Sequence, residues 1–397
     1  MRICAAPRAL CGAASVTSGE IMAAGTAQPS RLASLDQFRG YTVAGMFLVN
    51  FLGGYDAIRQ HAALLCHHNT YCSYADTIMP QFFFAVGVSF RLTFLRRVEK
   101  DGYGAAIRHA IKRNLGLILL GIAFYGIADD GMSWNAIVTA GVWGYITQHL
   151  KWSVIQTLIH IAFASLWVLP VIGAKPSVRV VYLAASGLGH LLLSQVWYYN
   201  WNEHADGTID GGPLGFLTWT VPLLAGSLAH DTLHARGSRG AMRPFTVWAI
   251  VLMVAGYGLS CMNAVHNAML GNVSGGWRAW LVEPPFVAPA LPTDLWTMNQ
   301  HAGSLSYMVF SAGFSLIVLV FFIWLSDLKN VQVGMFRTFG VNALAGYIIH
   351  GMTSATIRPL VPDDAPLYMA VLNFLLFYWV TWLFLRHLEK HKLFLRL

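Results

Sequence analysis

Long apolar stretches recur along most of the chain and constrain its fold more than any other feature. Each is long enough to cross the hydrocarbon core of a bilayer as a helix, which takes roughly 20 residues. Only 11% of the residues are charged, whereas a soluble domain has about 25%. The stretches therefore predict an all-α fold, a polytopic bundle of about ten transmembrane helices. The expected ranges are 39–55, 77–95, 114–128, 153–173, 179–197, 214–230, 244–262, 304–325, 338–356 and 367–386.

The remaining sequence leaves no room for a soluble domain of normal size. Residues 1–30 are rich in Ala, Gly and Ser and lack an apolar run of the kind found in secretory signals. We expect them to form a poorly ordered N-terminal extension, in which Met1 and Met22 are both candidate start residues. Residues 31–397 are expected to form a single transmembrane domain.

Lys and Arg residues gather in alternate connections between the expected helices, which predicts that both termini are cytoplasmic. The loops at 56–76, 129–152, 198–213, 263–303 and 357–366 would then face the periplasm or a lumen. This pattern accounts for the net charge of +8 as a topology signal and argues against nucleic acid as a partner. The basic residues of the first two such connections are Arg91, Arg96, Arg97, Lys100, Arg108, Lys112, Arg113, Lys175 and Arg179.

Three polar residues mark the first expected helix. Asp36 and Arg39 lie three positions apart at its cytoplasmic entrance and therefore share a helix face. They could pair and anchor the helix end, or reach into a cavity that holds the phosphates or pantetheine of a cofactor. Asn50 lies near the outer end of this helix, where its amide needs a partner. It could bind another helix, orient a catalytic group or donate to a developing oxyanion.

The first outer loop contains three histidines and two cysteines, namely His61, Cys66, His67, His68 and Cys72. Asp76 follows at the start of the second helix, where a carboxylate needs a partner such as a histidine. Three chemistries are open: a zinc site, a disulfide between the cysteines in an oxidising compartment, and a histidine held by Asp76 as general base or nucleophile. The spacing fits no common zinc pattern, so we expect no metal.

Several segments of this region carry a resemblance to a known family. They are Ser34-Leu35-Asp36-Gln37-Phe38-Arg39-Gly40, Met46-Phe47-Leu48-Val49-Asn50, the histidine-bearing loop, and the segment from Tyr74 to Gly87 that begins Tyr74-Ala75-Asp76-Thr77. In order and spacing they resemble the start of the heparan-α-glucosaminide N-acetyltransferase family and its bacterial relatives. Weaker similarities occur at Arg113-Asn114-Leu115 and from Gly340 to Tyr347.

The resemblance implies transfer of an acetyl group from acetyl-CoA to an amino sugar or glycan on the outer side of a bacterial inner membrane. It also implies a catalytic histidine in the first outer loop. Counted back from the Ala-Asp pair, the family's spacing of about ten residues lands on Cys66, and His67 is the nearest histidine, with His68 next. Counted forward from the asparagine of the first helix, the family's spacing lands on His61. Asp76 and Asn50 would assist this histidine. The Trp-Asn-Gly or Trp-His-Gly that usually follows it is replaced here by Asn69-Thr70-Tyr71.

Two further polar residues lie in the expected ninth helix. Asn342 and His350 are eight positions apart, which predicts a shared helix face. They could line the cofactor cavity with Asp36 and Arg39, or form hydrogen bonds between helices. Beside the acyltransferase, two other functions are open: a secondary transporter or exporter, and a non-catalytic paralogue of the acyltransferases. The chain could also form a homodimer.

Overall fold

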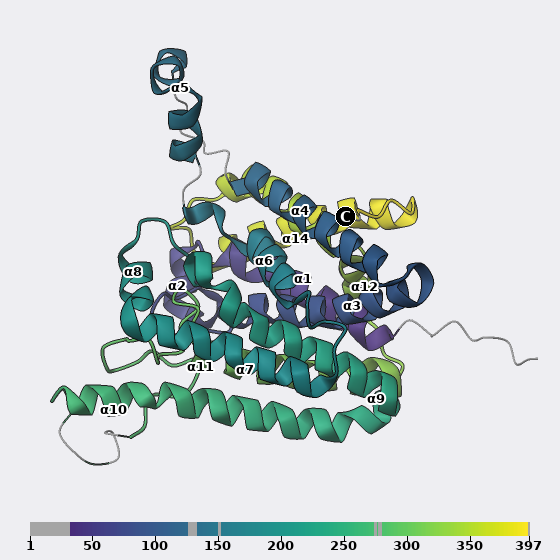
Figure 1. Cartoon of the computed structure of the whole chain (residues 1–397). Coiled ribbons are helices and arrows are strands. Elements are labelled where there is room, and N and C mark those ends of the chain that lie inside the picture. The colour runs from purple at the N-terminus through teal and green to yellow at the C-terminus, as the bar shows by residue number, and fades with distance from the viewer. Residues whose placement is uncertain (1–31, 126–132, 150–151, 274–275, 277–279, 396–397) are drawn as a thin grey trace, which may run out of the picture. The chain divides into compact units, whose positions relative to one another are not determined.

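A computed structural model describes residues 32–125, 133–149, 152–273, 276 and 280–395. The expected N-terminal extension, with Met1 and Met22, lies outside these residues. The described part of the chain consists of helices and loops and contains no strand (Figure 1). The all-α prediction is confirmed for that part.

The α-helices follow one another along the chain with short connections, except before α11. They are α1 (Ala33–Leu52), α2 (Asp56–His61), α3 (Ile78–Asp101), α4 (Tyr103–Tyr125), α5 (Trp134–His149), α6 (Thr157–Val168), α7 (Pro176–Leu193), α8 (Tyr199–His204), α9 (Phe216–Ser260), α10 (Met262–Met269), α11 (Leu305–Phe322), α12 (Gly334–Val341), α13 (Ala343–Ile357) and α14 (Leu367–Lys390). Short 3₁₀ turns include Ala75–Thr77 before α3, and π-helical segments extend α7 at Ser194–Tyr198 and α11 at Ile323–Leu328.

Five helical stretches of the described chain are long and apolar enough to cross a membrane, which indicates a membrane protein. One of them, Gly212–Met269, covers two expected helices, 214–230 and 244–262. A break at Gly237 of α9, where φ is +66°, lies between these two ranges. The five stretches are Tyr74–Asp101, Pro176–His204, Gly212–Met269, Leu305–Leu328 and Leu367–Lys390.

The other expected transmembrane ranges correspond to shorter or more polar helices. The range 153–173 contains α6, which has only 12 residues. The single helix expected at 338–356 is wrong, because the chain breaks at Asn342 (φ −120°, ψ 44°) between α12 and α13. The Asn342 amide donates to the carbonyl oxygen of Leu393 in the C-terminal segment, a tertiary contact made at this break. Helix α4 begins at Tyr103, within an expected loop, and α5 occupies much of the loop expected at 129–152.

Helix α9 packs against α3, α6, α7 and α11, while α1 packs against α3, α12, α13 and α14. Glycines bring the backbones of α3 and α9 into direct contact. A Cβ atom at Gly87 would collide with the carbonyl oxygen of Leu223, and one at Gly226 would collide with that of Phe84. Small residues are what membrane helices use to approach so closely.

Two of the basic residues that were expected in loops are instead inside the helix bundle. Arg91 of α3 donates from Nε and Nη2 to the Asp231 carboxylate of α9 at 3.0 and 3.1 Å, and the buried Arg179 of α7 pairs with the same carboxylate. The loop assignment of Arg91 and Arg179 is therefore wrong. A charge at this depth requires a partner, and Asp231 supplies one for both.

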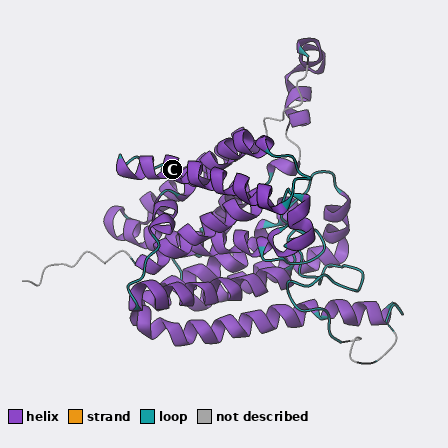
Figure 2. Ribbon diagram, turned by 180° about the vertical axis from the view of Figure 1, so that it is seen from behind, coloured by secondary structure: helices purple, strands orange, loops and turns teal. Residues whose placement is uncertain are grey.

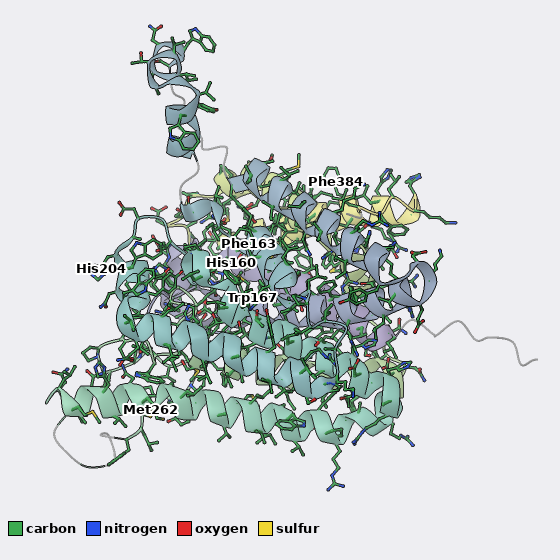
Figure 3. The ribbon with its side chains drawn as sticks, in the orientation of Figure 1. His160, Phe163, Trp167, His204, Met262 and Phe384 are labelled. Atoms are coloured by element: carbon green, nitrogen blue, oxygen red, sulfur yellow. The ribbon has the colours of Figure 1, made fainter. Side chains whose placement is uncertain are left out.

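Large apolar side chains remain exposed along α7, the second half of α9, and α14. Phe384 of α14 is among them, and Met262, the first residue of α10, is also exposed (Figure 3). An apolar surface of this extent is costly in water and suits a hydrocarbon environment. The exposed residues of α14 include Leu372, Leu375, Leu376, Trp379, Leu383 and Phe384.

Candidate functional site

The loops that the sequence assigns to the outer side are joined to one another by hydrogen bonds. Figure 2 shows many of the loops gathered at one end of the helices. Because separate loops meet in one layer, residues far apart in the sequence can contribute to one site. The bonds are Asp56 N to Asp363 O (3.0 Å), Phe286 N to Cys72 O (3.0 Å), Gly211 N to His301 O (2.9 Å), and Asn299 Nδ2 to Asn69 O.

Ser73 closes the first of these loops into a compact turn. Its Oγ donates to the carbonyl oxygen of Cys66 at 2.7 Å and accepts from the backbone N–H of Asp76 at 3.3 Å. The Ser73 N–H also donates to Oδ2 of Asp76 at 2.8 Å. These bonds hold the carboxylate of Asp76 against the segment that carries His67.

His67 and Asp76 form a close pair at the centre of this loop. His67 Nδ1 donates to Asp76 Oδ1 at 2.7 Å. Asp76 is only 1% exposed, whereas the side chain of His67 is 45% exposed. Because a carboxylate only accepts hydrogen bonds, Nδ1 carries the proton, and Nε2 presents its lone pair in the neutral ring.

The surroundings of His67 favour its charged form. Burial lowers the pKa of His67, but the hydrogen bond and negative charge of Asp76, together with the charge of Asp210, outweigh burial and raise that pKa above the ordinary value of 6.5. The imidazole is thus a stronger base than a free one.

Nε2 of His67 faces a hollow in the protein surface that we call the histidine hollow. Its volume is about 420 Å³, and Asn50 Oδ1 lies 3.4 Å from Nε2. The Asn50 amide is exposed at the outer end of α1, so it lines the site and does not bind another helix. The lining residues are Val49, Asn50, Gly53, Arg59, Cys66, His67 and His68.

The two other candidate histidines have different surroundings. The ring of His68 stacks on Tyr71 with centroids 4.3 Å apart, and its Nε2 donates to the carbonyl oxygen of Ala63 at 2.9 Å. His61 is exposed at the end of α2 and does not line the histidine hollow. Of these three histidines, His67 is the one that has both a carboxylate partner and a ring nitrogen in the histidine hollow.

The two cysteines of the loop are buried free thiols. Burial, and then the charge of Asp76, raise the pKa of Cys72, and burial also raises the pKa of Cys66. The described residues contain no group of three or more His, Cys, Asp or Glu side chains arranged to hold a metal ion. The contact that this loop does show, between His67 and Asp76, is the one that the general-base interpretation requires.

The residues that the sequence suggested for the cofactor do not come together with the histidine hollow. Asp36 and Arg39 lie half-buried in the first turns of α1, at the end where Ser34 Oγ donates to Asp327 Oδ2 at 2.7 Å. His350 Nδ1 donates to the carbonyl oxygen of Tyr347 within α13 at 2.6 Å, and its ring stacks on Phe47.

Asn342 is the N-cap of α13, and its carbonyl oxygen accepts from the N–H of Gly346 at 2.8 Å, so the shared face of Asn342 and His350 stays a prediction. Asn342 Nδ2 donates to the carbonyl oxygen of Leu393 in the C-terminal segment at 3.0 Å. This contact between separate elements matches the structural alternative for Asn342.

Residues of α11 and of the loop before it take part in the site although no sequence motif marks them. The hydroxyl group of Tyr307 donates to the carbonyl oxygen of Asp76 at 2.6 Å. Asn299 binds the backbone at Asn69, two residues after His67, and the next residue, Gln300, donates to Asp210. The only signal in the sequence was the length of the 263–303 connection, since long loops are often functional.

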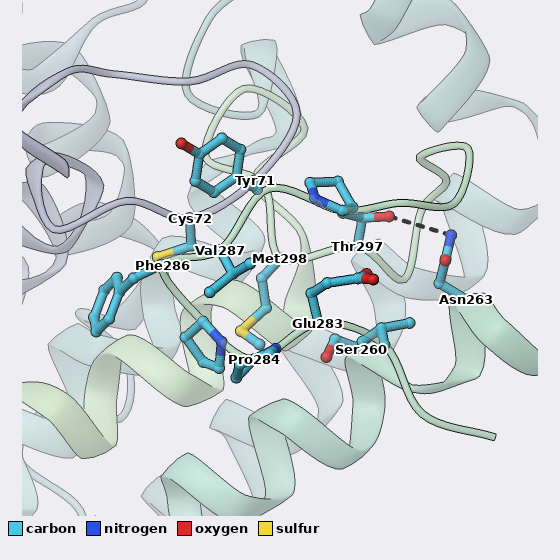
Figure 4. A pocket seen from close by; sticks show the side chains of 13 residues that line it. Tyr71, Cys72, Ser260, Asn263, Glu283, Pro284, Phe286, Val287, Thr297 and Met298 are labelled. Carbon is cyan, nitrogen blue, oxygen red and sulfur yellow. Dashed lines mark hydrogen bonds between the residues drawn. The ribbon is translucent and has the colours of Figure 1, made fainter. Parts of the chain in front are cut away.

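A second hollow lies beside the first loop but is too small for a substrate. Figure 4 shows Tyr71 and Cys72 on one side of it and Asn263, Thr297 and Met298 among the other lining residues. Its volume of about 30 Å³ accommodates about one water molecule. The larger histidine hollow is therefore the better candidate site.

Fold and site together describe a helical membrane protein with a histidine–aspartate pair in a hollow formed by its loops. A scan against models of protein families finds no match, and a search of curated proteins finds no significant match. The function is therefore argued from the geometry of the site.

Proposed function

We propose that this protein is a membrane-embedded acyltransferase that moves the acetyl group of acetyl-CoA to an amino sugar or glycan. The acceptor binds on the extracytoplasmic side of a membrane, most simply a bacterial inner membrane. The observation that carries the proposal is the pair of His67 Nδ1 and Asp76 Oδ1 at 2.7 Å, together with the second ring nitrogen, Nε2, which lies in the hollow 3.4 Å from Asn50 Oδ1. The resemblance of the sequence to the heparan-α-glucosaminide N-acetyltransferases supports the same activity.

The proposal includes a bundle of about ten spans with both termini in the cytoplasm. Contacts at the end of the helices remote from the histidine hollow support this topology. Asp327 accepts from Ser34 at the start of α1 and from Ser238 beside the break in α9, at 2.7 and 2.6 Å. Asn342 binds the C-terminal segment at Leu393. The start of α1 thus contacts residues near two connections that we expect to be cytoplasmic, those around Ser238 and Asp327.

The residues of the hollow are suited to acetyl transfer. As the acceptor nitrogen forms a bond to the acetyl carbon and the carbon–sulfur bond breaks, Nε2 of His67 takes the acceptor's proton. The imidazolium then returns that proton to the departing thiolate of CoA. Asp76 holds the ring in the tautomer that this requires and stabilises its charged form. The amide group of Asn50 can donate to the carbonyl oxygen on which negative charge develops.

The test is turnover by the purified full-length protein with labelled acetyl-CoA and a panel of amino sugars. We expect His67→Ala to lower the rate by about 10²–10⁴-fold, the usual contribution of a general base. The matched control is His61→Ala, in the same loop but outside the hollow, which should retain its rate. Loss of activity only in His61→Ala would move the catalytic site. Passage of an unmodified solute across vesicles without acetylation would instead indicate a transporter.

The topology has its own test. In Asn69→Cys the new side chain is exposed, and the carbonyl oxygen that binds Asn299 is retained. An impermeant thiol reagent should label it in intact cells, while the parent protein, whose described cysteines are buried, serves as the control. Labelling only after permeabilisation would invert the proposed orientation.

A further inference from the structure

A second carboxylate, Asp210, lies near the histidine–aspartate pair. It belongs to the loop between α8 and the turn at Gly212–Leu214, and its backbone adopts the left-handed conformation with φ of +55°. The indole Nε1 of Trp219 donates to its carbonyl oxygen at 2.7 Å. A non-glycine residue is uncommon in this conformation, and it is held there by packing that leaves the side chain only 7% exposed.

Only one oxygen of this carboxylate is bound by a neighbouring side chain. Gln300 Nε2 donates to Oδ1 of Asp210 at 2.7 Å. Among the residues that the structure describes, none donates to Oδ2. A buried carboxylate with an unused oxygen is costly unless a donor or a cation binds it.

Gln300 also fixes the position of Asp210 relative to the pair. Its Nε2 lies 3.7 Å from Sδ of Met79, in the first turn of α3, three residues after Asp76. The preceding residue, Asn299, binds the backbone at Asn69. The two adjacent residues thus connect Asp210 to both ends of the segment 69–79, which carries Asp76 and begins two residues after His67.

The charges of these groups do not balance. The negative charge of Asp210 contributes to the raised pKa of His67, and Asp76 in turn raises the pKa of Asp210, so the three groups are within electrostatic reach. When His67 is neutral, the two buried carboxylates near it have no cation among these three groups. The guanidinium of Arg59 in the hollow is paired with Asp56 at 3.0 Å.

We propose that Asp210 binds the cationic amino group of the acceptor and thereby selects amines over the corresponding neutral sugars. This inference rests on the proposed function for the identity of the acceptor, and adds the residue that recognises it. The ammonium group would donate to Oδ2 of Asp210. From there it would lose one proton to Nε2 of His67, which releases that proton to solvent, so that the neutral ring can take the second proton as the amine attacks the thioester.

The protonation states of the neighbouring groups are compatible with this role. Burial, opposed by the Gln300 hydrogen bond and the charge of His67, raises the pKa of Asp210 to about 6. The carboxylate is therefore ionised at the higher pH at which His67 is neutral. Gln300, the side chain that binds Asp210, is uncharged.

The experiment measures binding of glucosamine and of glucose to the full-length protein in lipid nanodiscs, without acetyl-CoA, by isothermal titration calorimetry. Glucose replaces the amino group by a hydroxyl group and serves as the uncharged probe. We expect the unmodified protein to bind glucosamine at least about tenfold more tightly than glucose, as for a charge-assisted hydrogen bond. Asp210→Asn should abolish that preference. The control Asp206→Asn, an exposed carboxylate in the same loop, should keep it.

Each outcome bears on the assignment. If the unmodified protein binds glucosamine and glucose equally well, the assignment of Asp210 is wrong. This result needs no variant, so it can be obtained even if Asp210→Asn does not fold. A preference that survives in Asp210→Asn also overturns the assignment. If the preference for glucosamine is lost in Asp210→Asn, the assignment of Asp210 is supported. If the unmodified protein at the same time forms no acetylated product from acetyl-CoA, the acyltransferase proposal is refuted and the assignment of Asp210 stands. Acetylation with an unchanged KM for glucosamine in Asp210→Asn supports the transferase and refutes the role of Asp210.

Discussion

The chain contains two histidine–aspartate pairs with closely similar bonds but different surroundings. His67 Nδ1 lies 2.7 Å from Asp76, and His266 Nδ1 lies 2.8 Å from Asp294. In both, the second carboxylate oxygen accepts a backbone N–H, that of Ser73 for Asp76 and that of Trp296 for Asp294. The two histidine side chains are also equally exposed, at 45% and 46%.

The two pairs differ in the carboxylate and in what lies beyond the imidazole. Asp76 is 1% exposed and Asp294 is 12% exposed. His67 borders the histidine hollow next to Asn50, whereas His266 lines neither of the two hollows described above. A histidine–aspartate pair is thus not a site by itself. A concave surface and a third polar group near the free ring nitrogen are needed to bring a substrate to it.

The largest effect that separates the pairs should come from their carboxylates. Asp76→Asn keeps the size of the side chain but lets it donate to Nδ1, which favours the wrong tautomer of His67. We expect the acetylation rate to fall by about 10²–10⁴-fold. The matched variant Asp294→Asn should stay within about threefold of the parent rate, since no reacting group is expected near it. Rates are measured with labelled acetyl-CoA at saturating acceptor.

A different result would remove the distinction between the pairs. Equal losses in the two variants would mean that both carboxylates act through folding, which the thermal unfolding midpoint of each variant would reveal. A large loss confined to Asp294→Asn would place the reaction at His266.

The pH dependence gives a smaller but more specific effect. His67 must be neutral to accept a proton, and Asp76 raises the pKa of His67 above 6.5. The rate should therefore rise with pH and reach half its maximum above 6.5, and the residual rate of Asp76→Asn should do so at lower pH. Stability should change in the opposite sense. The stabilisation from the charged pair is complete below pH 6.5 and is lost as the pH rises through the raised pKa of His67.

A pH–rate profile and thermal unfolding at each pH test both signs. His67→Gln is the control for stability, because it has no group that titrates in this range and should lose the pH dependence that comes from the pair. A parent profile whose half-maximum lies below 6.5 would contradict the role of Asp76.

Helix content was predictable from the sequence because apolar stretches of membrane length leave few alternatives to a helix. The limits of the helices were less predictable, because they depend on single side chains. The break at Asn342 and the buried positions of Arg91 and Arg179 follow from tertiary partners, Leu393 and Asp231, that no local pattern reveals. A count of Lys and Arg per connection cannot distinguish a solvated arginine from one paired inside the bundle.

The site was predictable only as far as its residues are close in the sequence. His67 and Asp76 lie nine residues apart, so one loop contains both, and the family resemblance points to the same place. Asp294 follows His266 by 28 residues, and Asp210 reaches the pair only through Gln300. Contacts of this kind depend on how the outer loops meet, which the sequence of each loop does not determine by itself.

The smallest expected effect concerns His266 itself. Its ion pair is nearly half exposed, and exposed pairs contribute about 0.5 kcal/mol to the free energy of unfolding. His266→Ala should therefore lower the unfolding midpoint only slightly and leave acetylation unchanged. Asp294→Ala should destabilise more, because it also removes the acceptor for the backbone N–H groups of Trp296 and Thr297. Such a result would assign the second pair to the fold of its loop, while loss of acetylation in His266→Ala with an unchanged midpoint would give it a share in the reaction.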